Sequence, residues 1–113
     1  MNSDNKKMYD KGINRLFDGI KEDYNKFTSY ADGRRGFADG LHIKPGRKFD
    51  KVMNGTSAWG FIAKTDGLLK GIPYFVGDVF KAATYRAPAK HVRGSIFSAE
   101  TNWYSWTGPR YLV

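Results

Sequence analysis

The first quarter of the chain carries its apolar side chains at helical spacing. Between residues 4 and 29 they recur every three or four positions, which places them on one face of a helix, while most lysines fall elsewhere. Ser3 or Asp4 can cap the start of this helix. Gly12 and Gly19 each weaken it by about 1 kcal/mol relative to alanine, so we expect packing of the apolar face to stabilise it. That face consists of Tyr9, Ile13, Leu16, Phe17, Ile20, Tyr24 and Phe27.

A glycine-rich segment follows. Tyr30, Phe37 and Leu41 keep a helical spacing, and the glycines at positions 33, 36 and 40 form a ridge of small residues beside them. This pattern predicts a short second helix that ends near Gly40, and two successive turns are the alternative. Pro45 ends any helix here, and we expect a loop over residues 44–56.

The second half reads as short strands separated by turns. Residues 57–65 are rich in strand-forming side chains and precede Asp66-Gly67, a strong turn signal. A short strand, a turn through Pro73, a turn at Gly77-Asp78 and a strand over residues 79–85 come next. Residues 94–98, 102–106 and the C-terminal residues are further strand candidates. Helices before strands predict one α+β domain over residues 1–113, with one or two N-terminal helices (1–43) packed on a small antiparallel β-sheet or partial barrel (57–113).

Three segments of this half occur in a characteristic order: AWGFIAKTDG, GDVFKAATYRAPAKHVRGSIF and WTGPRYL. The ordered set resembles small accessory proteins of tailed bacteriophages, a group of unsettled function. The resemblance covers about residues 57–113 and none of the helical part. It implies a phage origin and a compact β-rich module, but no catalytic residue. It also implies that the partner is nucleic acid, or a host enzyme or defence protein that the chain would inhibit.

Composition narrows the classes of function. The formal net charge is +8 and the excess of lysine and arginine extends over both halves, which favours an anionic partner, although solubility alone is the alternative. The chain has no cysteine and two histidines, so a thiolate site, a sulfur-ligated zinc site and a multi-histidine metal site are excluded. We expect no cofactor. The chain shows neither a signal peptide nor a run of apolar residues long enough to span a membrane, so we expect a cytoplasmic protein, in an infected bacterial host if the resemblance holds.

One basic stretch lies between two strand candidates. TYRAPAKHVRGSIF, residues 84–97, contains Arg86, Lys90, His91 and Arg93 but no acidic residue, and Lys81 lies just upstream. Its proline and glycine predict an ordered connection between the strands. Its arginines and lysine favour contact with phosphate. A solvated loop without a ligand is the alternative.

Aromatic residues provide candidates for base stacking. In NWYSW, strand alternation separates Trp103 from Tyr104 and Trp106. We expect Trp59 and Trp106 in the core, and Trp103 or Tyr104 exposed beside cations, where a ring can stack on a base.

A second basic patch comprises Arg34, Arg35, Arg47, Lys48 and Lys51. A solvated helix face is the alternative for its first members. The segment GRRG lacks the Gly-Lys-Ser/Thr ending of a phosphate-binding loop.

Enzymatic activity has little support in the sequence. His91 can act as an acid or base only if the fold brings Asp78 or Glu100 to it, so we predict no catalytic residue. We expect a basic protein that binds nucleic acid through phosphates with weak sequence preference. An inhibitor of a host protein is the first alternative and a nucleotide-binding protein the second.

Overall fold

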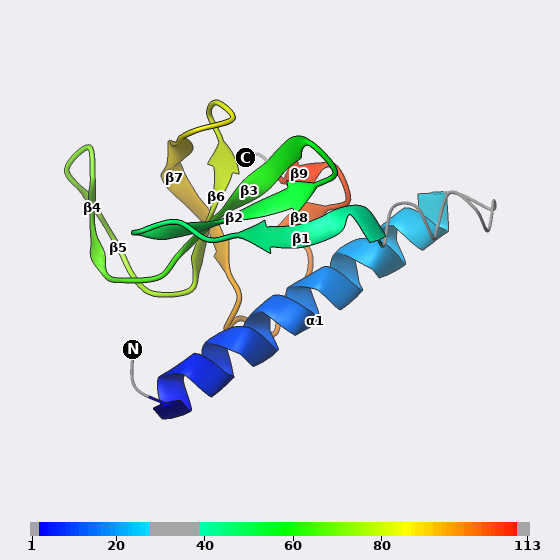
Figure 1. Ribbon diagram of the computed structural model, residues 1–113, viewed down its shortest axis with the longest axis horizontal. Coiled ribbons are helices and arrows are strands. Elements are labelled where there is room, and N and C mark those ends of the chain that lie inside the picture. Colours follow the sequence, from blue (N-terminus) through cyan, green and yellow to red (C-terminus); the bar gives the residue numbers. More distant parts are fainter. Residues whose placement is uncertain (1–2, 28–38, 111–113) are drawn as a thin grey trace.

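One helix packs against a five-stranded antiparallel sheet in the computed structural model, which describes residues 3–27 and 39–110 (Figure 1). Helix α1 spans Ser3–Phe27, as the helical spacing predicts. The sheet has the order β1-β2-β3-β6-β7. Its strands are β1 (Leu41–Lys44), β2 (Phe49–Asn54), β3 (Ser57–Ala63), β6 (Asp78–Ala82) and β7 (Pro88–Ser95). The predicted α+β class is therefore confirmed.

Two small hairpins complete the fold. Strands β4 (Gly67–Leu69) and β5 (Ile72–Tyr74) form a hairpin that projects away from the helix in Figure 1. Its turn lies at Lys70-Gly71, not at Pro73, because both turn residues have positive φ, of 51° and 81°, which matches the twist of a two-residue hairpin. Strands β8 (Tyr104–Ser105) and β9 (Gly108–Pro109) form the other hairpin, against α1, β3 and β6.

The main core lies between α1 and the sheet. The apolar face of the helix buries Tyr9, Ile13, Leu16 and Ile20 against a set of sheet and hairpin residues. Each of these side chains stabilises the fold by roughly 1.5–3 kcal/mol through burial. The set comprises Leu41, Val52, Trp59, Ile62, Val79, Ile96 and Tyr104.

A second, aromatic core lies on the other side of the sheet. Phe61, Tyr74 and Phe80 are buried there, and Phe49 packs against Tyr74 and Phe80 with ring centroids 5.2 and 5.7 Å apart. Both faces of the central strands are therefore covered, which explains the nearly continuous apolar run of β3.

The expected loop over residues 44–56 is wrong, since β2 and its turn into β3 occupy most of it. The acidic and basic side chains of FDKVMN hide the alternation of a strand. Asp50 is nevertheless 6% exposed, because it accepts a hydrogen bond from Tyr9 of the helix. The partner that buries Asp50 lies 41 residues away, so a local pattern could not reveal it.

The basic stretch is also different from the expected connector. Residues 88–95 form β7, an edge strand paired with β6, and only residues 83–87 connect the two. The strand expected over residues 79–85 correspondingly ends at Ala82. Of the candidate strand at 94–98, only residues 94 and 95 are extended, as the end of β7. Of the candidate at 102–106, only the two residues of β8 are extended.

Some expectations lie outside the described residues. These are most of the second helix, including Tyr30 and Phe37, and the last three residues of the chain. Among the residues that the structure does describe, no helix is long and apolar enough to cross a lipid bilayer.

Candidate nucleic-acid interface

Five cationic side chains line a cleft of about 290 Å³ on the sheet. We call it the basic cleft. Its walls come from the end of β1, the β1–β2 loop, β2 and β3 on one side, and from Arg86 and the first residue of β7 on the other. Its charged lining residues are Lys44, Arg47, Lys48, Lys51 and Arg86, and no acidic residue lines it; the other lining residues are Pro45, Gly46, Phe49, Phe61 and Pro88.

The β1–β2 loop is held in place by the end of β3. The Lys64 backbone N–H donates to the Lys48 carbonyl at 2.9 Å, and the Lys64 Nζ donates to the Gly46 carbonyl at 3.1 Å. A side chain at Gly46 would collide with the Phe49 carbonyl, so the close approach of the backbone requires glycine here. The loop therefore presents Arg47 and Lys48 from an ordered backbone.

The opposite wall is a compact turn. The backbone N–H groups of Ala83 and Thr84 both donate to the Ala87 carbonyl, at 3.0 and 3.2 Å, and the Arg86 N–H donates to Thr84 Oγ1 at 3.2 Å. The β6–β7 pairing is interrupted twice, and such bulges bend and twist an edge ribbon. The bend explains how this turn reaches cations of β2 across the intervening β3.

Tyr85 joins the two walls. The Lys51 Nζ lies 3.8 Å from the centroid of the Tyr85 ring, and the Lys44 Nζ lies 5.7 Å from it. Both distances fall within the range of cation–π attraction. Tyr85 does not itself line the cleft, but it is 45% exposed, so an aromatic ring that solvent can reach lies beside two of the cleft's cations.

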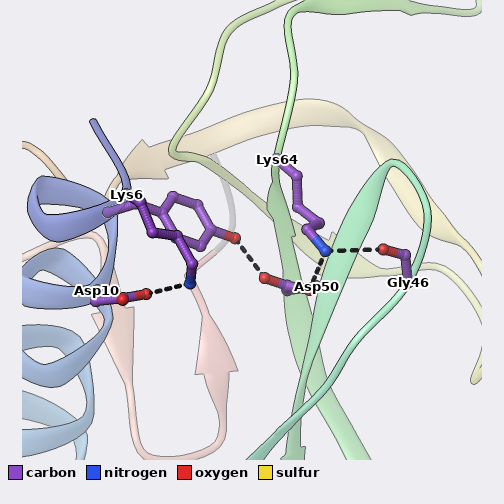
Figure 2. A network of polar contacts seen from close by, with 6 residues as sticks. Lys6, Asp10, Gly46, Asp50 and Lys64 are labelled. Carbon is purple, nitrogen blue, oxygen red and sulfur yellow. Dashed lines mark hydrogen bonds and ion pairs between the residues drawn. The ribbon is translucent and has the colours of Figure 1, made fainter. Parts of the chain in front are cut away.

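The nearest acid in the sequence faces the other way. Asp50 precedes Lys51, and successive strand residues point to opposite faces of a sheet. Asp50 Oδ2 accepts a hydrogen bond from Tyr9 at 2.8 Å, and Oδ1 lies 3.3 Å from the Lys64 Nζ, as Figure 2 shows for the Asp50–Lys64–Gly46 part of this network. The carboxylate is therefore neutralised on the helix side and leaves the positive charge of the cleft uncompensated.

The structure combines part of each predicted basic patch. Arg86 of the first patch and Arg47, Lys48 and Lys51 of the second line the same cleft. The remaining two members of the second patch, Arg34 and Arg35, lie outside the described residues.

The rest of the first patch lies elsewhere. Lys90 and His91 are exposed on β7 and do not line the cleft, and Arg93 is half-buried on the same strand. Lys81 donates from its Nζ to the Pro109 carbonyl at 3.4 Å. The sequence leaves open a pair of His91 with Asp78 or Glu100. Within the described part of the chain, no hydrogen bond or ion pair joins His91 to either of them.

The expected exposure of Tyr104 is wrong. Tyr104 is 7% exposed in the main core, and burial raises the pKa of its hydroxyl. Trp103 is half-buried, with its Nε1 donating to the Glu100 carbonyl at 3.0 Å. The physical reason is that NWYSW begins a tight hairpin that folds onto α1, so strand alternation does not decide which ring meets water.

Trp59 and Trp106, both expected in the core, are buried to different extents in the structure. Trp59 is 4% exposed and donates from Nε1 to the Ser105 carbonyl at 3.0 Å, which confirms it as a core residue. Trp106 is half-buried and packs on the rings of Tyr24 and Phe27, with centroids 5.0 and 4.9 Å away. It therefore covers the end of the main core and is only partly enclosed by it.

Two residues of the site escaped the sequence reasoning. Lys44 adjoins the Pro45-Gly46 turn, and Tyr85 directly precedes Arg86. The signal that could have identified them is an aromatic or cationic residue at a turn, where a side chain is held in place but remains accessible.

Over the residues that the structure describes, no three histidine, aspartate or glutamate side chains gather as metal ligands would. The model of a family described as a family of unknown function (DUF7717) matches residues 2–112. No curated protein and no solved structure shows significant similarity to the chain.

Proposed function

The chain belongs to this family of unknown function, and on that premise we propose that it binds nucleic acid by holding phosphates in the basic cleft. One observation carries the proposal: five cationic side chains from separate segments line one cleft without an acidic neighbour in its lining. Like charges repel when they are gathered together, so a polyanion that neutralises them gains binding free energy from each contact.

The types of cation suit phosphate. Arg47 and Arg86 present planar forks that can hold two phosphate oxygens at once, while the lysines act as point charges. Both arginines are exposed, so their guanidinium groups can reach a ligand without a change of fold.

The lining offers cations for the sugar–phosphate backbone and no side chain that reads adenine. It contains no asparagine or glutamine, the side chains that read adenine through paired hydrogen bonds. Phosphate contacts position a nucleic acid but carry no sequence information. We therefore propose weak sequence preference.

Salt dependence tests the proposal. Fluorescence anisotropy with labelled oligonucleotides should show binding at ~50 mM salt that weakens steeply toward ~200 mM, with a log–log slope of roughly −0.7 to −0.9 for each phosphate neutralised. The triple variant Arg47→Gln, Lys48→Gln, Arg86→Gln should flatten that slope by about 2 to 3.

A control with the same net charge separates the cleft from general electrostatics. Lys7→Gln, Lys11→Gln, Lys26→Gln removes three exposed cations from α1, which packs on the other side of the sheet. This control should retain most of the slope. Equal loss in both triple variants, or no binding of the unchanged protein at ~50 mM salt, would refute a phosphate site in the cleft.

A further inference from the structure

We infer that the basic cleft selects single-stranded over duplex nucleic acid, because Tyr85 provides a ring on which one unpaired base stacks. The inference rests on the proposed function and adds the strandedness of the ligand and the residue that recognises it. The carrying observation is that an accessible ring lies beside Lys51 and Lys44, two cations that line the cleft, and directly precedes a third, Arg86.

Tyr85 differs from the other accessible aromatic rings of the described structure. Phe27, Phe75 and Phe97 are 68%, 61% and 42% exposed, yet none of them lies under a cation in the described contacts. Tyr85 combines exposure with two ammonium groups at 3.8 and 5.7 Å from its ring centroid. That combination is what a base with its flanking phosphates requires.

The position of the ring is fixed before any ligand arrives. The hydrogen bonds from Ala83, Thr84 and Arg86 hold the backbone on both sides of Tyr85. The Lys51 ammonium lies over the ring, 3.8 Å from its centroid, and its attraction favours this position of the ring. A platform that is already ordered loses little conformational entropy on binding, so stacking contributes more to the affinity.

The surroundings of the ring match the chemistry of a nucleotide strand. A base that stacks on Tyr85 brings its neighbouring phosphates toward Arg86 on one wall and toward Lys44 and Lys51 on the other. In a duplex the bases are paired and stacked on each other, so the ring can reach one only after it has been unpaired and extruded. The phosphates of a duplex can still contact the cations, which leaves weaker, purely electrostatic binding.

The experiment compares one labelled oligothymidine strand of about 12 nucleotides, a length within the site size of single-strand binders, with a duplex of equal length. We expect the strand to bind about tenfold more tightly than the duplex at one salt concentration. Tyr85→Leu should lose about tenfold on the strand, within the range that base stacking contributes, and less than about twofold on the duplex. Tyr85→Phe and Tyr85→Trp, which keep a ring, should retain the affinity.

Two controls make the test specific. Phe75→Leu removes a ring that is more accessible than Tyr85 but lies away from the cleft's cations, and it should change nothing. An abasic strand offers phosphates without bases, so the unchanged protein and Tyr85→Leu should bind it equally. Circular dichroism of each variant establishes that it is folded.

The outcomes separate this inference from the proposed function. Equal affinity for strand and duplex would overturn the stacking role, and so would equal losses of Tyr85→Leu on oligothymidine and on the abasic strand. Either result would do so even if the triple cationic variant still flattens the salt dependence. Absence of binding to every probe would overturn both.

Discussion

Replacing Tyr9 by phenylalanine removes one hydroxyl from the interface between α1 and the sheet. Tyr9 is 1% exposed, and its Oη donates to Asp50 Oδ2 at 2.8 Å. Asp50 is itself 6% exposed, and its other oxygen lies 3.3 Å from the Lys64 Nζ (Figure 2). The substitution therefore takes the hydrogen-bond donor from one oxygen of a buried carboxylate, leaves the ion pair with Lys64 and keeps the ring in place.

The expected loss follows from the type of hydrogen bond. A hydrogen bond to a charged group contributes about 1.5–3 kcal/mol to the free energy of unfolding, and an unsatisfied buried acceptor adds to the loss. Phenylalanine opens no cavity at the ring, and Lys64 still compensates the carboxylate. We expect Tyr9→Phe to lower the free energy of unfolding by about 2 kcal/mol. For a domain of this size that corresponds to a decrease in Tm of roughly 8 °C.

The pH dependence provides a second signature. Burial raises the pKa of the Tyr9 hydroxyl far above its ordinary value, and the hydrogen bond and negative charge of Asp50 raise it further. The folded protein therefore keeps this proton at a pH where the unfolded chain, with a tyrosine pKa near 10.0, releases it. The stabilisation by the hydroxyl is complete below pH 10.0 and decreases above it, so the difference between the two proteins should narrow in alkali.

Urea denaturation at several pH values from neutral to alkaline measures both signatures. Tyr85→Phe is the matched control, because that residue is 45% exposed and its variant should stay within about 0.5 kcal/mol of the unchanged protein. A loss below about 0.5 kcal/mol for Tyr9→Phe, or a difference that does not change between neutral and alkaline pH, would refute the hydroxyl–carboxylate bond as a stabilising contact.

Three further substitutions test the packing of the helix and one turn. Ile20→Ala removes a fully buried side chain from the main core and should cost about 2–5 kcal/mol in urea denaturation. Gly19→Ala should destabilise the protein by about 1–3 kcal/mol despite the higher helix propensity of alanine, because its Cβ would collide with the Tyr104 hydroxyl; a gain in Tm would contradict this contact. Burial raises the pKa of Asp78 above 3.8, so its stability contribution, present below pH 3.8, is lost as pH rises through the folded pKa. Asp78→Asn, which can still accept from the Phe75 N–H, should therefore be the more stable protein at pH 7 by thermal melting, with the advantage disappearing below pH 3.8.

The helix and the central strands could be predicted from the sequence because their signals are local. The periodic apolar face of α1 and the apolar run of β3 describe what each segment buries, whatever its partner is. The order of helix before strands then limits the fold to an α+β class. The net positive charge similarly favours an anionic partner, without locating the surface that would bind it.

Only the tertiary structure decided which polar residues are buried and which cations meet. The charged Asp50 leads to the prediction of a loop where β2 lies, because its burial depends on the hydrogen bond from Tyr9 of the helix. Tyr104, expected to be exposed, is buried because it lies in a hairpin against α1, whereas Tyr85, for which the sequence offered no role, is accessible in the turn of a bent ribbon. The basic cleft joins Lys51 to Arg86 across β3. Such contacts depend on strand order and twist, which arise from the packing of the whole chain and are not encoded in any one segment.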